Sequence, residues 1–268
     1  MVNRKQNSRA RTCAIAVAGA ATLLAFPGVA NAALTSKVEG GVLTVESTLA
    51  ESITITCDGG NVEVNDANPG TGAASCASIT SIVVLGGSGA NTINLAGVTA
   101  AQFTTLTATT IDAGDLNDTI TGSERNDTII WNPGDDDDLN DGQGGTDTIQ
   151  VNGGNGGEQF TVKPSATAGR VQFDRTGPTP PGPFNLDIVR AERPDMNANG
   201  GDDTFTADGG LDALGFKLDV SGGDGNDVLT GDDGATRSRA TPVTTRSRPT
   251  TTRSARATSR WAATATTR

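Results

Sequence analysis

Hydrophobic and polar residues alternate in short runs along this chain, without the period of a helix. Between residues 34 and 110, stretches rich in Val, Ile and Thr are bounded by Gly, Asp and Asn. This pattern is typical of β-strands, and no stretch has a convincing amphipathic helical pattern. The expected strands are Val42–Val45, Ile53–Thr56, Val62–Val64, Ile79–Leu85 and Thr92–Leu95.

A repeated unit begins near residue 86. A glycine-rich turn precedes an acidic or amide residue, then one further residue, then an apolar one. Successive acids from Asp118 to Glu158 are 9, 10, 10 and 11 residues apart, which indicates stacked repeats and not disorder. The clearest copies end in Asn91-Thr-Ile93, Asp118-Thr-Ile120, Asp127-Thr-Ile129, Asp137-Asp-Leu139, Asp147-Thr-Ile149, Glu158-Gln-Phe160, Asp203-Thr-Phe205, Asp212-Ala-Leu214 and Asp227-Val-Leu229.

One copy of this unit is complete. Residues 222–230 match the nonapeptide Gly-Gly-x-Gly-x-Asp-x-apolar-x. Over 86–160 and 199–234 the chain therefore resembles the RTX, or haemolysin-type, calcium-binding repeat family. The resemblance implies a parallel β-helix or β-roll with calcium held between stacked turns. It would pair Asp118 with Asp137, and Asp127 with Asp147.

The residue types of the unit suit calcium on chemical grounds as well. Calcium takes six to eight oxygen ligands at about 2.3–2.6 Å. A glycine turn exposes backbone carbonyl oxygens, and the acid adds a carboxylate. The residue two after the acid should face the interior, because side chains alternate along a strand. The candidate metal ligands are Asp118, Asp127, Asp137, Asp147, Glu158, Asp203, Asp212, Gly222, Asp224 and Asp227.

Several turns depart from the complete motif. Arg125 replaces a glycine, Asn91 carries no charge, and the turn after Trp131 contains Pro133 followed by four consecutive aspartates at 135–138. We therefore expect some turns to connect strands without metal. Bound cations would relieve the repulsion within the aspartate run.

The repeated unit is absent from the sequence between residues 161 and 198. Two strand-like stretches there flank a proline-rich segment, which predicts a hairpin-like insertion projecting from the repeat body. The resulting organisation has β-rich N-terminal coils at 33–110 and calcium-binding repeats at 111–160 and 199–234.

Composition excludes several classes of catalytic site. The chain has no His and no Tyr, so it contains neither a Ser-His-Asp triad nor a His-liganded zinc site. We expect a binding protein and not an enzyme. Two alternatives stay open: a calcium-dependent adhesin that binds cell-surface or cell-envelope components, and a carbohydrate-active enzyme using carboxylates such as Asp115 and Asp118.

The two ends of the chain differ from its body. All 31 acids lie within 33–234, against eight basic groups. Residues 1–32 combine a basic start, a short apolar run and Ala30-Asn-Ala32, as in a cleaved secretory signal peptide. No stretch is long enough for a transmembrane segment. These features predict a secreted or cell-surface protein that does not bind nucleic acid.

Residues 235–268 contain eight arginines and no acid, which predicts a disordered basic tail. Its Thr-Arg-Ser units at 236 and 245 keep the nine-residue period. Back-translation with a shift of one nucleotide permits Gly-Asp-rich repeats, so the tail also fits a frameshifted continuation of the repeats. The coding DNA tests this hypothesis.

Two cysteines remain after removal of the predicted signal peptide. Cys57 and Cys76 have no nearby basic residue to stabilise a thiolate. In an exported chain such a pair favours a disulfide. Taken together, the sequence predicts an exported all-β protein, a parallel β-helix or β-roll, whose calcium-binding turns couple ion binding to folding.

Overall fold

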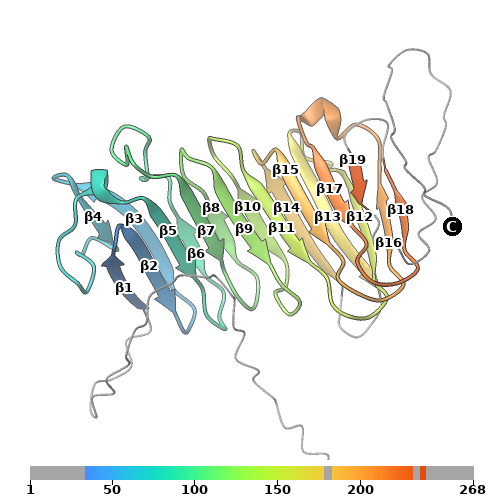
Figure 1. The fold of residues 1–268 in the computed structure, drawn as a ribbon, viewed down its shortest axis with the longest axis horizontal. Helices are drawn as coiled ribbons and strands as arrows, with labels where there is room; N and C mark the ends of the chain where they lie inside the picture. The colour runs from blue at the N-terminus through green and yellow to red at the C-terminus, as the bar shows by residue number, and fades with distance from the viewer. Residues whose placement is uncertain (1–33, 178–182, 232–235, 240–268) are drawn as a thin grey trace, which may run out of the picture. The chain divides into compact units, whose positions relative to one another are not determined.

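The strands of this protein form two sheets. The computed structural model describes residues 34–177, 183–231 and 236–239. Sheet A has nine strands in the order β1-β2-β5-β7-β9-β11-β15-β17-β19 (Figure 1). Their bounds are β1 Leu34–Glu39, β2 Val42–Ser47, β5 Ser81–Leu85, β7 Ala108–Asp112, β9 Asp127–Trp131, β11 Thr148–Asn152, β15 Arg193–Asn197, β17 Leu218–Ser221 and β19 Thr236–Arg239.

Sheet B has ten strands in the order β18-β16-β12-β13-β14-β10-β8-β6-β3-β4. No α-helix occurs among the described residues, which contain only the short 3-10 turns η1 (Cys76–Ser78) and η2 (Asp212–Leu214). The strand bounds are β3 Ser52–Asp58, β4 Asn61–Val64, β6 Thr92–Asn94, β8 Thr119–Thr121, β10 Asp138–Asp141, β12 Gln159–Pro164, β13 Arg170–Gly177, β14 Phe184–Val189, β16 Thr204–Ala207 and β18 Val228–Thr230. The all-β prediction is confirmed, and the strands expected between 42 and 95 form with small shifts at their ends.

From β5 to β11 the chain alternates between the two sheets. Each strand pairs in parallel with the strand two positions further on, as in β5 with β7 and β6 with β8. The same parallel pairing continues from β7 to β9, from β8 to β10 and from β9 to β11. Every crossing between the sheets therefore needs a turn, and equivalent turns stack along the direction of hydrogen bonding.

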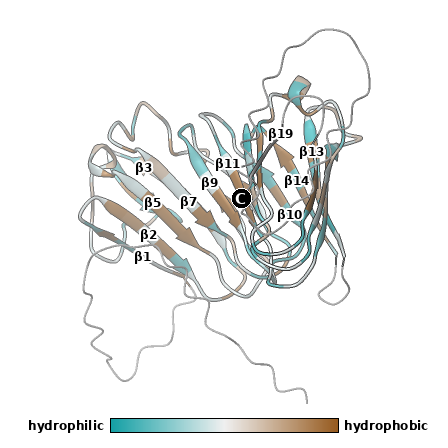
Figure 2. Cartoon of the chain, turned by 45° about the vertical axis from the view of Figure 1, so that its right-hand side comes forward, coloured by the Kyte–Doolittle hydropathy of each residue, from teal (hydrophilic) through white to brown (hydrophobic). Residues whose placement is uncertain are grey.

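One hydrophobic cluster fills the space between the sheets. Apolar residues at alternate strand positions face it, which explains why the strands carry most of the hydrophobic colour in Figure 2. In sheet A, Ile111, Ile129 and Ile149 are in register on neighbouring strands and fully buried. Rows of Ile and Val therefore supply a large part of the core, together with Leu and Phe.

The segment 161–198 does not project from the body, contrary to the sequence prediction. Its strands β13 and β14 enter sheet B between β10 and β12, with β13 antiparallel to both neighbours. Inward-facing aromatic residues explain this placement. Phe173 is fully buried, and Phe184 stacks on Trp131 with ring centroids 3.8 Å apart.

The C-terminal boundary also differs from the prediction. Residues Thr236–Arg239, assigned to a disordered tail, form β19 in parallel register with β17. The open edge of β17 offers backbone donors and acceptors, so pairing there does not require apolar side chains. The predicted signal peptide (1–32) and the remaining tail (240–268) lie outside the described residues. No helix within the described ranges is both long and apolar enough to cross a membrane.

Antiparallel pairs close the N-terminal end of both sheets. Strand β1 pairs with β2, and β3 pairs with β4. A disulfide joins Cys57, on β3, to Cys76, with their Cα atoms 6.1 Å apart and 19 residues of sequence separation. The bridge fixes the loop between β4 and η1 against this end of the core.

We predict that replacing both cysteines by serine destabilises the protein by about 3 kcal/mol, because the reduced unfolded chain gains the entropy of an open loop. Chemical denaturation with and without reductant measures the change. Reductant should lower the midpoint of the unchanged protein and leave that of the double variant unaltered. Equal midpoints for all four samples would contradict the prediction.

Candidate cation-binding turns

Buried acidic residues lie where turns between the sheets end. Turns from sheet A to sheet B end at Asn91, Asp118, Asp138, Glu158, Asp203 and Asp227. Turns in the opposite direction end at Asp127 and Asp147. Each of these side chains is at most 7% exposed. Placing so many acids away from water is costly unless something compensates their charge.

The acids form three ladders of hydrogen bonds between successive turns. In the first ladder, the backbone N–H of Asn91 donates to Oδ1 of Asp118 (2.6 Å), and that of Asp118 donates to Oδ1 of Asp138 (2.8 Å). In the second ladder, the N–H of Asp127 donates to Oδ1 of Asp147 (2.9 Å), and that of Asp147 to Oε2 of Glu192 (2.9 Å). Each carboxylate thus ties its own turn to the preceding one.

The third ladder joins Glu158, Asp203 and Asp227 across the C-terminal turns. The N–H of Glu158 donates to Oδ1 of Asp203 (2.7 Å), and that of Asp203 donates to Oδ1 of Asp227 (3.1 Å). Backbone contacts hold the same turns together, including Gly201 N–H to the carbonyl oxygen of Asp224 (2.8 Å). The complete nonapeptide of the sequence therefore lies in the last turn of this stack.

Four of the ladder carboxylates have one oxygen without a partner. These are Oδ2 of Asp118, Asp147, Asp203 and Asp227, all buried and without a hydrogen bond. A buried charge with half of its acceptor capacity unused is unfavourable in a protein interior. An oxygen-seeking cation would supply the missing interaction.

Other ladder residues are satisfied by the protein itself. Asp127 accepts hydrogen bonds from the Ser123 backbone N–H (2.7 Å to Oδ2) and from the Ser123 hydroxyl (2.9 Å to Oδ1). Glu158 accepts the Gly154 N–H (2.7 Å) and is 2.9 Å from Nε of Arg175. The Asn91 amide donates to two carbonyl oxygens. In these three turns the protein itself supplies partners for the buried polar side chains.

The Arg125 side chain explains the departure of its turn from the glycine pattern. Its Nη2 donates to the carbonyl oxygens of Ala100 (2.9 Å) and Phe103 (3.0 Å). The arginine therefore holds the segment between β6 and β7 against this turn.

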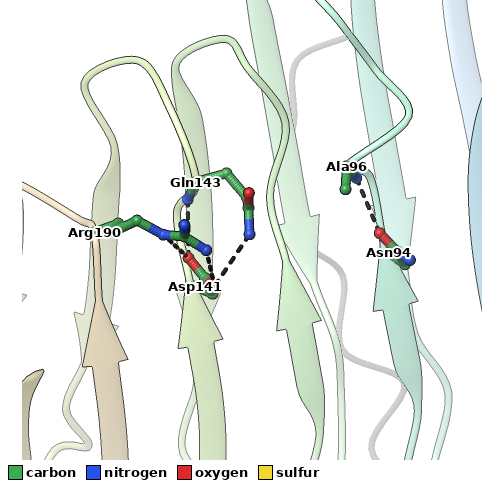
Figure 3. Close-up of polar contacts among 5 residues, drawn as sticks. All are labelled: Asn94, Ala96, Asp141, Gln143 and Arg190. Carbon is green, nitrogen blue, oxygen red and sulfur yellow. Dashed lines mark hydrogen bonds and ion pairs between the residues drawn. The ribbon is translucent and has the colours of Figure 1, made fainter.

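Asp141, close to the second ladder, is also neutralised by the protein. The guanidinium of Arg190 pairs with it, with Nε 2.7 Å from Oδ1 (Figure 3). Gln143 donates to Asp141 from both its backbone N–H and its side-chain amide (3.1 Å each). A similar local bond joins the Ala96 N–H to Asn94. Among the described residues, the buried carboxylate oxygens without a hydrogen bond are thus those of the four ladder positions.

The predicted pairing of Asp127 with Asp147 agrees with the strand register, since Thr128 lies opposite Thr148. The predicted pairing of Asp118 with Asp137 is wrong by one residue, because Leu139 lies opposite Thr119 and places Asp138 next to Asp118. Asp137 is exposed and accepts the N–H of Asn185 (2.6 Å).

The spacing from the buried isoleucine of the preceding strand distinguishes Asp138 from Asp137. Asp118 follows the buried Ile111 of β7 by seven residues, and Glu158 follows the buried Ile149 of β11 by nine. An odd spacing from Ile129 selects Asp138, not Asp137. Leu139 is consequently 37% exposed, and Asn140 is buried opposite Ile120. The expectation that Leu139 faces the interior is therefore wrong.

Two further predicted ligands lie away from the buried ladders. Asp212 is exposed in η2, where its carboxylate accepts the neighbouring Ala213 N–H (2.8 Å). Asp212-Ala-Leu214 is therefore not a copy of the repeat, since Leu211 and Phe216 supply the buried side chains here. The side chain of Asp224 is exposed, although its backbone belongs to the turn stack.

The sites lack a cluster of acidic side chains. Among the described residues, no three or more Cys, Asp or Glu side chains converge in an arrangement that would hold a metal. A cation bound to one or two of these carboxylates would need backbone carbonyl oxygens or water to complete its coordination. Such a donor set fits calcium.

Burial raises the pKa of the ladder aspartates. Loss of water around Asp118, Asp147 and Asp203 raises the pKa of each to about 7, although backbone N–H groups oppose the shift. For the same reason the pKa of Asp138 rises to about 8 and that of Asp127 to about 6. Without a cation, Asp138 favours the protonated form at neutral pH, and Asp118, Asp147 and Asp203 are close to half protonated.

Comparison of the chain with protein-family models, with curated proteins and with solved structures finds no match.

We predict that the metal-free protein is more stable at pH 5 than at pH 8. The folded aspartates have pKa values of about 6 to 8, against about 3.9 when unfolded. The folded state consequently binds more protons between about pH 4 and 8, and the free energy of unfolding falls as pH rises. Thermal unfolding in chelator measures this dependence.

Two variants control the pH experiment. Asp118→Asn removes one buried titrating group and should reduce the slope, whereas the exposed Asp212→Asn should leave it unchanged. A Tm that rises between pH 5 and pH 8 would contradict the assignment of buried, proton-binding aspartates.

We also predict that Gly142→Ala destabilises the protein by about 1–3 kcal/mol, the usual cost of overpacking. A Cβ atom at Gly142 would lie 2.5 Å from Oδ2 of Asp147 and even closer to the carbonyl oxygen of Arg190. Gly156→Ala is the matched control, because nothing lies within 4 Å of its added Cβ. Denaturant unfolding should separate the two variants, and equal stabilities would contradict the close packing.

Proposed function

We propose that this protein is an exported calcium-binding repeat protein in which calcium completes the turns ending at Asp118, Asp147, Asp203 and Asp227. The observation that carries the proposal is the unpartnered, buried carboxylate oxygen at each of these positions. The resemblance of 222–230 to the RTX nonapeptide supports the same assignment. Asp137 and Asp212 are not part of this refined set.

The available donors favour calcium over other metals. The chain has no His, and Cys57 and Cys76 are consumed by their disulfide. Carboxylate and carbonyl oxygens remain, which suit hard cations. Magnesium requires near-ideal octahedral geometry and keeps several waters, whereas calcium accepts irregular sets of oxygens.

Bound calcium would neutralise buried charge in this protein. The four carboxylates then remain ionised in the interior, and the raised affinity of Asp118, Asp147 and Asp203 for protons is replaced by affinity for the metal. Because each of these acids also accepts a backbone N–H from the preceding turn, cation binding at one turn would stabilise the stacking of two. Calcium binding is thereby coupled to folding.

The architecture proposed for the protein is a β-roll or parallel β-helix interrupted by inserted strands. Alternation of the chain between two sheets and parallel pairing from β5 to β11 support this assignment. The antiparallel strand β13 is the main departure from a regular coil.

Export is part of the proposal. Calcium is abundant outside cells, and a disulfide such as Cys57–Cys76 is typical of oxidising compartments. The sequence of 1–32 has the pattern of a signal peptide. Folding of the repeats would then follow secretion into a calcium-rich medium.

Equilibrium dialysis of four variants and their combination tests the proposal. Replacing Asp118, Asp147, Asp203 and Asp227 by Asn keeps an acceptor for each backbone N–H but removes the charge. We expect each replacement to weaken calcium binding and all four together to abolish it. Replacement of the exposed Asp136, Asp212 and Asp224 is the matched control and should leave binding unchanged. Undiminished binding by the fourfold variant would refute the assignment.

A further inference from the structure

The inserted strand β13 delivers a positive charge to the third ladder. Val171, Phe173 and Arg175 alternate inward along this strand, and all three are buried. Arg175 lies opposite Phe160 in the pairing of β13 with β12, where the register shifts by a bulge. The guanidinium therefore reaches Glu158, two residues before Phe160, from inside the protein.

The contact between Arg175 and Glu158 is a buried ion pair. Nε of Arg175 lies 2.9 Å from Oε1 of Glu158, and their side chains are only 4% and 5% exposed. The other carboxylate oxygen of Glu158 accepts the Gly154 N–H (2.7 Å). An arginine keeps its charge at all ordinary pH values, so this position of the ladder has a permanent counter-ion.

The two other acids of the same ladder lack such a partner. Asp203 and Asp227 each accept one backbone N–H from the preceding turn and have a second, buried oxygen without a hydrogen bond. The order of strands in sheet B explains why only Glu158 has a counter-ion. Of the strands that follow these three acids, only β12, which follows Glu158, lies next to β13.

We infer that Arg175 is an internal cation that takes, at Glu158, the place of a calcium ion, an inference that rests on the proposed calcium binding at the other turns. The turn 153–158 then closes without metal. At Asp203 and Asp227, which extend the same ladder, calcium supplies the counter-ion that the protein does not. The insertion thereby sets which turns of the C-terminal stack respond to calcium.

Removing the arginine should create a calcium site. In Arg175→Met, Glu158 becomes a buried carboxylate without a counter-ion, as at Asp203. We expect the variant to bind one more calcium ion per chain than the unchanged protein, and to show a lower Tm in chelator that calcium restores. Equilibrium dialysis and thermal unfolding of the full chain measure the two effects.

Two variants serve as controls. Arg170→Met removes another arginine of β13, whose partner Asp187 is partly exposed, and should leave the ion count unchanged. The double variant Glu158→Gln, Arg175→Met removes both charges of the buried pair, which is often tolerated. It should fold in chelator and bind the same number of ions as the unchanged protein.

The outcomes separate this inference from the proposed function. If the unchanged protein binds no calcium, both are overturned. If it binds calcium and Arg175→Met binds no additional ion, only the role of Arg175 is overturned. Failure of Arg175→Met to fold at any calcium concentration, while the double variant folds, also overturns it, because calcium then does not replace the guanidinium.

Discussion

The fold depends on buried carboxylates that accept backbone N–H groups from the preceding turn. Parallel strands that alternate between two sheets must turn at every crossing, and each turn leaves backbone donors that the strand ladders do not satisfy. Asp118, Asp147 and Asp203 use one oxygen for this purpose. The same contacts bring negative charge into the interior, so the turns stack stably only if this charge is compensated.

The protein compensates this charge in different ways at different turns. Ser123 donates to Asp127, Asn91 replaces an acid by an amide, and Arg175 pairs with Glu158. Four other turns, which end at Asp118, Asp147, Asp203 and Asp227, have carboxylate oxygens without a hydrogen bond. This division between internally satisfied turns and incomplete turns gives the calcium proposal its definite set of positions.

The strand periodicity and the stacking of Asp127 on Asp147 could be predicted from local sequence, because both follow from alternation and spacing. Asp138 could be identified as the ladder acid only by its spacing from Ile129 across the turn. The assumption that the apolar Leu139 faces the interior selected Asp137 instead. Arg175 could not be found this way, since its contact with Glu158 depends on where the inserted strand β13 enters sheet B. Asp212 follows Asp203 by nine residues, as a further repeat would, and this spacing did not reveal that Asp212 lies in a 3-10 turn.

The most direct test of the account is a calcium titration of the metal-free protein, followed by far-UV circular dichroism and by Tm. The account predicts that calcium increases both the β-sheet signal and the Tm, that chelator reverses the change, and that an equal concentration of magnesium does not reproduce it. A protein that is β-rich in chelator, with a Tm indifferent to calcium, would contradict the claim that the four incomplete turns bind this ion.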